Sequence, residues 1–552
     1  MTVFFIVKHT TKVNCNFKYR KVYYDCDKDK RILKSIDYFR RIIMQPMDWK
    51  KDYEEFDKVT RQFYAGEVPG PKYKGFSGGF GSYAQKGGKA SMLRLRMAGG
   101  RVTKEKMQFV ADAIKKGHTG KIHFTTCQTI QLHNLSEDSV CELAVKALDV
   151  GIVTRGAGGD FPRNVMVSPL SGLEIGEYFD VTPYAEAVAD YLMGFIKSVK
   201  LPRKLKVCFS NSAANLTHAT FRDLGFIARK DGKFDVYSAG GLGNNPKMGI
   251  KTAEAVDGSK LLYYVKAMVL LFTTYGNYEN RAKARTRFMQ DVLGDSYVEE
   301  FHKKLEEAMQ DELDINVAAK EIIKNTDKSI IKHPRVVAQK QSGLYAVYYH
   351  PIAGSPDVTK FVELIELVKD MDQVEFRLTP DEGMYIVNCS AVEAQKVLDA
   401  TTDSAENTFE TSVACIGGTI CQTGVRDSQK LLNDLVKASK EWNFDDGVLP
   451  QIHISGCPSS CGTHQIGRMG FRGGMKKVDG KPESAFILSV NGLEGQHDAQ
   501  FGEQLGAILE TEIPKFMEEL GKEIQASGLK FDAWYAENEE RFKEIAAPYV
   551  AE

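Results

Sequence analysis

The sequence lacks several features that would assign the protein to a common class. It has no apolar run long enough to cross a membrane, since the longest, 261–275, is interrupted by Lys266. Its first residues lack the apolar segment and small-residue cleavage site of a signal peptide. It has no excess of positive charge, because 73 Lys and Arg balance 73 Asp and Glu, and this argues against general nucleic-acid binding. It also lacks a GxGxxG motif for a nicotinamide or flavin nucleotide, and the GGLG at 240–243 does not supply one.

What is present is the composition of a large globular protein, with 552 residues of which 43% are hydrophobic and 26% charged. A chain of this length exceeds one typical core, so we expect roughly two to four domains. We expect a cytoplasmic location, where the ten cysteines would serve as thiols or metal ligands and not as a disulfide framework.

Four of the cysteines form two pairs in one stretch of the second half. Cys415 and Cys421 lie in ACIGGTIC, and Cys457 and Cys461 lie in GCPSSC. Four thiolates can hold a [4Fe–4S] cluster, for which four cysteine ligands are the rule. Structural zinc is an alternative, but its paired ligands are usually about two to four residues apart, and the first pair is more widely spaced. Unrelated buried thiols are a third interpretation, which the surrounding glycines disfavour because they let backbone approach a bulky group.

The order of predicted elements recurs in the second half. Residues 91–153 are expected to form a strand, a helix that begins after Thr103, two strands and a helix, the order of a ferredoxin-like unit. Residues 334–403 repeat it. Behind each unit, LPRKLKVCFSNSAAN at 201–215 aligns with LPQIHISGCPSSCG at 449–462, and only the second copy carries the four cysteines. Such a duplication implies two halves about a pseudo-twofold axis, with one cofactor between them.

Basic residues gather where the first half would face the cysteines. Arg94 and Arg96 lie at the end of a strand, Arg163 in GDFPRN, and Arg203, Lys204 and Lys206 in PRKLK. Solvated surface charge is the ordinary interpretation of such residues. Because Lys204 and Lys206 flank a leucine before an apolar run, we place both on one polar face of a central strand. Polar groups there need partners, and an anionic ligand would be one.

Two further sets of polar residues have a functional and an ordinary interpretation. Thr129, Gln131 and His133 alternate with apolar residues, so they either face solvent or hydrogen-bond the carboxylates of a cofactor. The basic run from Arg281 to Arg287 is expected to line a helix surface, from which long side chains could also reach a polycarboxylate cofactor.

On these motifs the chain resembles the sirohaem- and [4Fe–4S]-containing sulfite and nitrite reductases. The resemblance covers residues from about 76 to 540, and ACIGGTIC with GCPSSCG is its most specific part, supported by MLRLRMAGG, GDFPRN and PRKLK. It implies a set of cluster ligands: Cys415, Cys421, Cys457 and Cys461, the last also being the axial ligand of the sirohaem iron. It implies residues around the substrate: Arg96, Arg163, Lys204 and Lys206. Cofactor-binding residues would be Thr129, Gln131, His133 and Arg203.

The resemblance also implies a duplicated α+β fold, with two ferredoxin-like half-domains and two α/β domains that bind the cofactors. The expected domains are an N-terminal extension without assigned chemistry at 1–46, a helix and glycine-rich loop at 47–90, ferredoxin-like half-domains at 91–153 and 334–403, a sirohaem- and substrate-binding domain at 154–333, and a cluster- and sirohaem-binding domain at 404–552.

Within this family we favour the six-electron reduction of sulfite to sulfide. Lys206 stands where plant-type nitrite enzymes carry asparagine, and a second lysine suits dianionic sulfite better than nitrite. Reduction of nitrite to ammonia with the same cofactors is the alternative. A non-catalytic iron–sulfur electron carrier is another, although it gives the basic residues no purpose. Ferredoxin or a flavoprotein would donate the electrons, and no nucleic acid or membrane partner is expected.

One position departs from the family's pattern. Where the family often has an Asn-Arg pair, this chain has Thr126-Cys127, which removes one expected partner of substrate or cofactor carboxylates. A reactive thiol in the pocket is one interpretation of Cys127, and a buried, inert thiol is the one that we favour.

Overall fold

The computed structural model describes residues 47–317, 321–326 and 329–550, together with three short strands nearer the N-terminus. Those strands are β1 (Ile6–Val7), β2 (Lys12–Phe17) and β3 (Arg20–Asp25), which form one antiparallel sheet. Most of the predicted extension at 1–46 lies outside the described residues, so its expected lack of function stays a prediction.

The first ferredoxin-like unit is an antiparallel sheet in the order β4-β5-β8-β7 with two helices. Its elements are β4 (Ser82–Ala84), β5 (Ser91–Leu95), α4 (Lys104–Lys115), β7 (Lys121–Phe124), β8 (Ile130–Leu135) and α5 (Glu137–Lys146), preceded by α2 (Met47–Tyr64) and α3 (Gly70–Ser77). The Thr103 hydroxyl accepts a hydrogen bond from Lys106 N, which confirms the predicted start of α4. The prediction of a loop after α3 was wrong for β4, which pairs with β5 once Gly81, at φ +75°, has turned the chain.

The second ferredoxin-like unit repeats this order and borrows a strand from the first half. Its elements are β14 (Val336–Ala338), β15 (Tyr345–Tyr349), α11 (Val358–Val368), β16 (Glu375–Leu378), β17 (Met384–Cys389) and α12 (Ala391–Ala400). β6 (Arg101–Val102) completes the sheet by antiparallel pairing with β16. The two units share one hydrophobic core, in which the rings of Phe124 and Phe361 meet edge to face with centroids 5.6 Å apart.

Behind each unit lies a five-stranded mixed sheet, and the two sheets have the same topology. The first consists of β9 (Met166–Val167), β10 (Val207–Ser210), β11 (Leu224–Ala228), β12 (Phe234–Ser238) and β13 (Ile250–Val256), and the second of β18 (Val413–Ala414), β19 (Ile452–Ser455), β20 (Met469–Val478), β21 (Lys481–Val490) and β22 (Glu503–Leu509). In both, the first two pairings are parallel and the last two antiparallel. Val207 pairs with Leu224 as Ile452 pairs with Met469, so the motifs that echo in the sequence occupy equivalent places.

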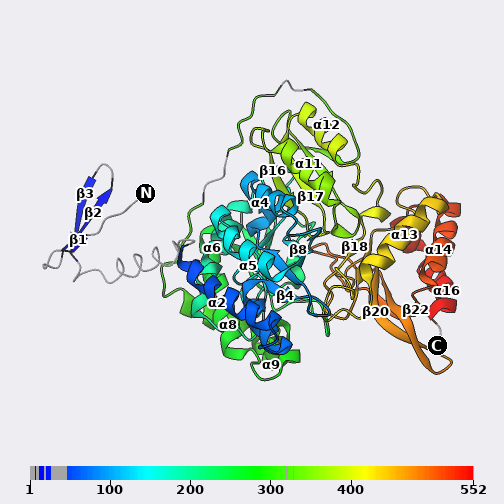
Figure 1. Cartoon of the computed structure of the whole chain (residues 1–552), viewed down its shortest axis with the longest axis horizontal. Coiled ribbons are helices and arrows are strands. Elements are labelled where there is room, and N and C mark those ends of the chain that lie inside the picture. The colour runs from blue at the N-terminus through cyan, green and yellow to red at the C-terminus, as the bar shows by residue number, and fades with distance from the viewer. Residues whose placement is uncertain are drawn as a thin grey trace.

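Helices cover both of these sheets. The first carries α6 (Thr182–Met193), α7 (Phe195–Ser198), α8 (Leu261–Tyr275), α9 (Met289–Leu293) and α10 (Tyr297–Ala308), and the second α13 (Ser428–Trp442), α14 (Ile513–Ser527), α15 (Phe531–Glu537) and α16 (Glu539–Val550). Figure 1 shows α13, α14 and α16 on one side of the molecule and α2, α6 and α8 on the other. The longest apolar run is the mostly buried helix α8, and among the described residues no helix combines the length and hydropathy that a membrane span requires.

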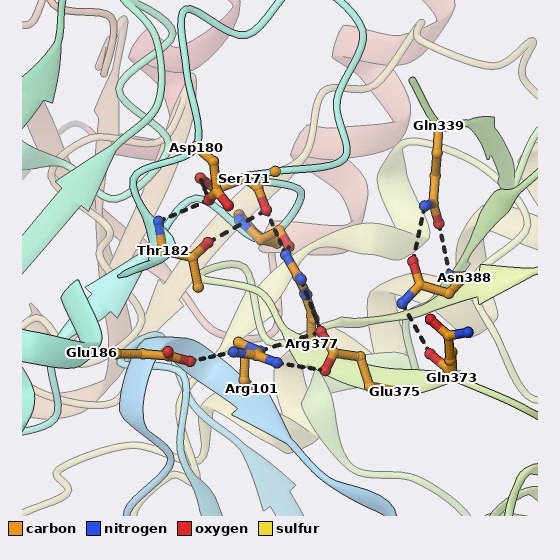
Figure 2. Close-up of polar contacts among 12 residues, drawn as sticks. Arg101, Ser171, Asp180, Thr182, Glu186, Gln339, Gln373, Glu375, Arg377 and Asn388 are labelled. Atoms are coloured by element: carbon orange, nitrogen blue, oxygen red, sulfur yellow. Dashed lines mark hydrogen bonds and ion pairs between the residues drawn. The ribbon is translucent and has the colours of Figure 1, made fainter. Parts of the chain in front are cut away.

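A polar network fastens the second ferredoxin-like unit to the first half (Figure 2). Arg101 donates to both carboxylate oxygens of Glu375, at 3.2 and 2.9 Å, and also contacts Glu186. Arg377 donates to Glu375 at 2.8 Å and to the carbonyl of Ser171 at 2.6 Å. The two halves are therefore joined by charge as well as by the shared core.

Candidate active site

One large cavity is lined by residues of both halves and has a volume of about 1420 Å³. Small-molecule sites usually measure about 300–1,000 Å³, so this one has room for a macrocycle and more. All the site residues predicted from the sequence line it: Arg96, Thr129, Gln131, His133, Arg163, Arg203, Lys204, Lys206, Cys415, Cys421, Cys457 and Cys461. The structure brings these residues together, while the role assigned to each stays a prediction.

The four cysteines lie on two neighbouring loops of the second half. Cys415 directly follows β18 and Cys421 lies in the turns before α13, whereas Cys457 and Cys461 lie in the loop after β19. Gly456 N donates a hydrogen bond to Cys415 Sγ at 3.2 Å, which ties one loop to the other. The thiols are thus presented by backbone that the sheet holds in place.

Two glycines let these loops approach other backbone closely. A Cβ on Gly462 would lie 2.1 Å from the carbonyl oxygen of Ile454, and one on Gly456 would lie 2.5 Å from that of Arg426. Neither distance is tolerable, so both positions require glycine. Close backbone packing therefore explains these two of the glycines that surround the cysteines in the sequence.

The thiols lie close enough to affect one another electrostatically. Burial raises the pKa of Cys415 to about 12, and Cys461 adds to the rise. Burial also raises the pKa of Cys461, with contributions from Cys457 and Cys421, although part of Cys461 is open to the cavity. Thiols in this state become thiolates when a metal takes the place of their protons.

The donor set fits a [4Fe–4S] cluster, because four cysteines from two loops face one space. Within the described part of the chain, no group of three or more His, Cys, Asp or Glu side chains is placed to hold a single metal ion.

The first half supplies Arg96, Arg163, Lys204 and Lys206 to the same cavity, and we call these four residues the cationic wall. Arg96, only 7% exposed, donates to the carbonyls of Pro162 at 3.1 Å and Arg163 at 2.9 Å. Arg163 donates to the carbonyls of Ala157 and Gly159, both at 2.9 Å. Carbonyls fix the guanidinium planes without cancelling their charge, so the charge stays available to an anion.

The cations of the wall perturb each other. Burial lowers the pKa of Arg96 and of Arg163 to about 10, and their neighbouring arginines contribute, yet both remain protonated at neutral pH. Burial, followed by the charge of Lys206, lowers the pKa of Lys204 well below its ordinary value. Burial also lowers the pKa of Lys206. A lysine whose pKa is lowered in this way releases its proton more readily than an ordinary lysine.

Lys204 and Lys206 lie just before β10 and not within a central strand, so that prediction was wrong. The leucine between them makes only an isolated bridge to Pro162, and β10 is next to the edge strand of its sheet. Lys206 N donates to the Asp223 carboxylate at 2.8 Å, which fixes the extended segment where it enters β10. Residues two apart in extended chain still point the same way, and both lysines reach the cavity.

The sheet of the first ferredoxin-like unit turns a polar face toward the cavity. Arg94 on β5 pairs with Gln131 on β8, and Gln131 pairs with His123 on β7. With the amide of Gln131 oriented to satisfy both neighbours, its oxygen accepts from Arg94 at 2.6 Å and its nitrogen donates to His133 Nε2 at 3.0 Å. Burial lowers the pKa of His133 well below its usual value, which leaves that nitrogen free to accept. Arg94 was among the basic residues expected on this wall, whereas His123 was missed, although it occupies a cavity-facing position of a strand that the sequence had indicated.

Cys127 is not the buried, inert thiol that we expected. It is half-buried and lines the cavity. Burial by itself would raise the pKa of this thiol, but the charges of Lys206 and Arg222 outweigh that effect and lower it to about 6. The sequence could not show that the segment before β10 brings Lys206 to Cys127.

Two other expectations need correction. Arg285 and Arg287 do not line a helix surface, because the run forms short 3-10 turns that carry both side chains inward. Arg285 donates to Asp223 at 3.0 Å and Arg287, 4% exposed, donates to the carbonyl of Asn245 at 2.8 Å. Tyr83 was missed: it lines the cavity, its hydroxyl accepts from a backbone N–H at 2.8 Å, and nearby arginines lower its pKa although burial opposes them.

Comparison with known families gives two matches. Residues 83–148 match the family described as a nitrite/sulfite reductase ferredoxin-like half domain, and residues 158–313 match the nitrite and sulphite reductase 4Fe-4S domain. Both matches fall on the first half, whereas the four cysteines lie in the second copy of the repeat.

Similar proteins include reductases of both anions. The chain is 26% identical over 447 residues to the ferredoxin–nitrite reductase of Synechococcus elongatus, covering 78% of this chain and 85% of that protein. It is 26% identical over 452 residues to sulfite reductase (ferredoxin) 1 of Mycolicibacterium paratuberculosis, covering 77% and 79%. The structure of the Mycobacterium tuberculosis NirA protein superposes with a TM-score of 0.74 at 25% identity, over 90% of this chain and 95% of that one. The predicted duplicated fold is confirmed.

Proposed function

We propose that this chain, a member of the family of sirohaem- and [4Fe–4S]-containing nitrite and sulfite reductases, reduces sulfite to sulfide with electrons from ferredoxin. The observation that carries the choice of sulfite is the presence of two lysines, Lys204 and Lys206, in the cavity beside Arg96 and Arg163. A dianion gains more than a monoanion from each added fixed cation. Ferredoxin is proposed as donor because the relatives of both kinds are named as ferredoxin enzymes. We also propose a cytoplasmic location, where free cysteines persist.

When bound, the cofactors of this family supply the electron-transfer chemistry, and the protein holds and orients them. Cys415, Cys421, Cys457 and Cys461 would hold the cluster, with Cys461 also serving the sirohaem iron. The Thr126 hydroxyl donates to the carbonyl of Cys461 at 2.8 Å, so the first half fixes this loop directly.

The work assigned to the protein's own residues is to bind the oxyanion and to provide protons. Arg96 and Arg163 keep their charge and have their planes fixed by carbonyls, which suits them to hold an oxyanion in one orientation. Lys204, whose pKa is lowered, suits proton donation as oxygen leaves as water. Charges act strongly here because protein surrounds the cavity.

Nitrite is the second candidate substrate, and one feature of the site favours it. Cys127 is a thiol of lowered pKa beside Lys206, so a thiolate would offset part of the charge on which the preference for sulfite depends.

Steady-state kinetics with sulfite and with nitrite would test the proposal, using a reduced viologen dye so that the donor protein is not needed. We expect a higher kcat/KM for sulfite. A higher kcat/KM for nitrite would replace the proposed substrate, and purified protein without tetrapyrrole absorption after adequate cofactor supply would contradict the assignment of cofactors.

A further inference from the structure

Gln128 and Glu382 occupy equivalent positions in the two halves but have different chemistry. Each has a left-handed backbone, at φ +53° and +68°, in the turn between the last two strands of its ferredoxin-like unit. Each side chain accepts a hydrogen bond at 2.9 Å from a backbone N–H of the adjoining mixed sheet: Gln128 from Val167 N and Glu382 from Ala414 N. The anchoring role is the same, and an amide is sufficient for it.

The second polar atom of each side chain, the amide nitrogen of Gln128 and the other carboxylate oxygen of Glu382, has a different partner in the two halves. The amide nitrogen of Gln128 donates to the carbonyls of Val167 and Leu378, at 2.8 and 2.7 Å, so every atom is satisfied by backbone. Glu382 instead directs its second oxygen at His123, with Oε1 3.5 Å from Nε2. The carboxylate at this position therefore differs from the amide of Gln128 in contacting a side chain, that of His123.

His123 is held by that contact and is unpaired on its other side. Its side chain is 4% exposed and that of Glu382 is 1% exposed, and both residues line the cavity. His123 Nδ1 is buried and has no hydrogen-bond partner among the described residues. A buried polar atom without a partner is costly, so a partner inside the cavity is expected.

We propose that His123, held by Glu382, anchors the tetrapyrrole by donating a hydrogen bond from Nδ1 to one of its carboxylates. An imidazole that faces a carboxylate with one nitrogen can present an N–H on the other nitrogen to a second carboxylate. Burial raises the pKa of Glu382, and the nearby His123 is the largest influence that opposes the rise. This inference rests on the cofactors of the proposed function and not on the choice between sulfite and nitrite.

A carboxylate of the cofactor fits better than the substrate as the partner of His123. His123 lies in a row with Gln131 and Arg94, on the face of the sheet that also carries the His133 ring, 6.5 Å from that of His123. The Arg163 guanidinium, which we assign to the substrate, lies elsewhere and is held by carbonyls of the 157–159 segment. His123 would also compensate for the partner that is lost where the family's arginine is replaced by Cys127.

The test compares His123→Ala, His123→Arg and Glu382→Gln with the unmodified holoenzyme. The measured quantities are sirohaem per chain from visible absorption, iron and sulfide content, and the rate of tetrapyrrole loss during dilution. For His123→Ala we expect loss to be about tenfold faster or more with the cluster retained, a factor that corresponds to about 1.4 kcal/mol. His123→Arg should restore retention because it provides another cationic donor, and Glu382→Gln should show a smaller increase.

His118→Ala is the matched control, since His118 Nε2 also lies near a carboxylate, 3.8 Å from Glu142, but outside the cavity. It should lose sirohaem at the unmodified rate. Retention by His123→Ala equal to that of the control would overturn the proposal. A raised KM for substrate in His123→Ala with unchanged sirohaem loss would also overturn it, by assigning His123 to the substrate. If nitrite proves to be the substrate, the proposed function changes and the sirohaem measurement is unaffected.

Discussion

The loop after β10 and the loop after β19 occupy equivalent places in the two halves, yet they treat their polar groups in opposite ways. In the first, the hydroxyls of Ser210 and Thr217 share a hydrogen bond at 2.7 Å, and the Asn215 amide donates to Thr220 at 2.8 Å. In the second, Cys457 and Cys461 line the cavity. A loop that satisfies its own polar groups has none to offer a ligand, whereas a loop that presents two thiols to a cavity can bind one.

The same contrast holds for charge. The first half contributes arginines and lysines to the cavity, and the second contributes thiols and Glu382. Burial and neighbouring cations lower the pKa of Arg96 and Lys204 in the first half, whereas burial raises the pKa of Cys415 and Cys461 in the second half. Duplication followed by divergence thus explains why one cavity serves two copies of the fold.

The largest effect is expected when Cys461, the proposed ligand of both the cluster and the sirohaem iron, is replaced, because this makes the loop after β19 more like the loop after β10. Cys461→Ser removes a thiol that interacts electrostatically with Lys204 and Lys206, and we expect iron, sulfide and tetrapyrrole absorption to fall together and activity to drop below detection. The control is Cys389→Ser, a buried thiol on β17 whose pKa burial raises to about 12. Full cofactor content in Cys461→Ser would show that Cys461 is not a ligand of either cofactor.

Changing the cationic wall instead should sharpen the contrast between substrates. For Lys206→Asn we expect kcat/KM for sulfite to fall about tenfold more than that for nitrite, a difference of about 1.4 kcal/mol in transition-state binding. Loss of one fixed cation costs the dianion more. Lys233→Asn, on the exposed surface of the same half, is the control. Equal losses for both anions would remove the reason for preferring sulfite.

The sequence predicted the duplicated fold and the residues that line the cavity better than it predicted the positions of individual side chains. The repeat was visible because helical and strand periodicity survive duplication, and Thr103 caps its helix as its position indicated. The position of Lys206 relative to its strand, and its approach to Cys127, depend on how the 154–333 segment packs on the first sheet. His123 was overlooked because a lone histidine between apolar residues resembles a core residue, and its partner Glu382 comes from the other half.

Replacing Arg101, which pairs with Glu375 and Glu186, would test whether the two halves are joined by contacts outside the cofactor site. We expect Arg101→Ala to cost about 1–3 kcal/mol of stability, since it leaves Glu375 buried and partly unpaired. The thermal unfolding midpoint should fall while cofactor content per folded chain is unchanged.

The control for this network is Arg61→Ala, an exposed pair with Asp57, which should change little. Arg377 and Arg101 lower the pKa of Glu375 although burial opposes them. The stability that the network adds is therefore present at neutral pH and lost as the pH falls through the lowered value. The difference between Arg101→Ala and the unmodified protein should narrow in acid, and equal midpoint shifts for both variants would contradict a special role of the network.

The smallest effect concerns two thiols of the first half, one in the cavity and one in the core. Charges around Cys127 lower its pKa to about 6, whereas burial raises that of Cys208 to about 11. Alkylation depends on the thiolate. The rate at Cys127 should therefore rise from pH 5 and level off near pH 7, because the thiol is almost fully deprotonated once the pH exceeds the lowered pKa. Cys208 should not react over that range. Mass spectrometry of peptides after brief iodoacetamide treatment would measure both, with Cys127→Ser identifying the labelled site. A rate at Cys127 that still climbs above pH 8 would mean that Lys206 does not share its charge with the thiol, and it would remove the feature that makes nitrite a competing substrate.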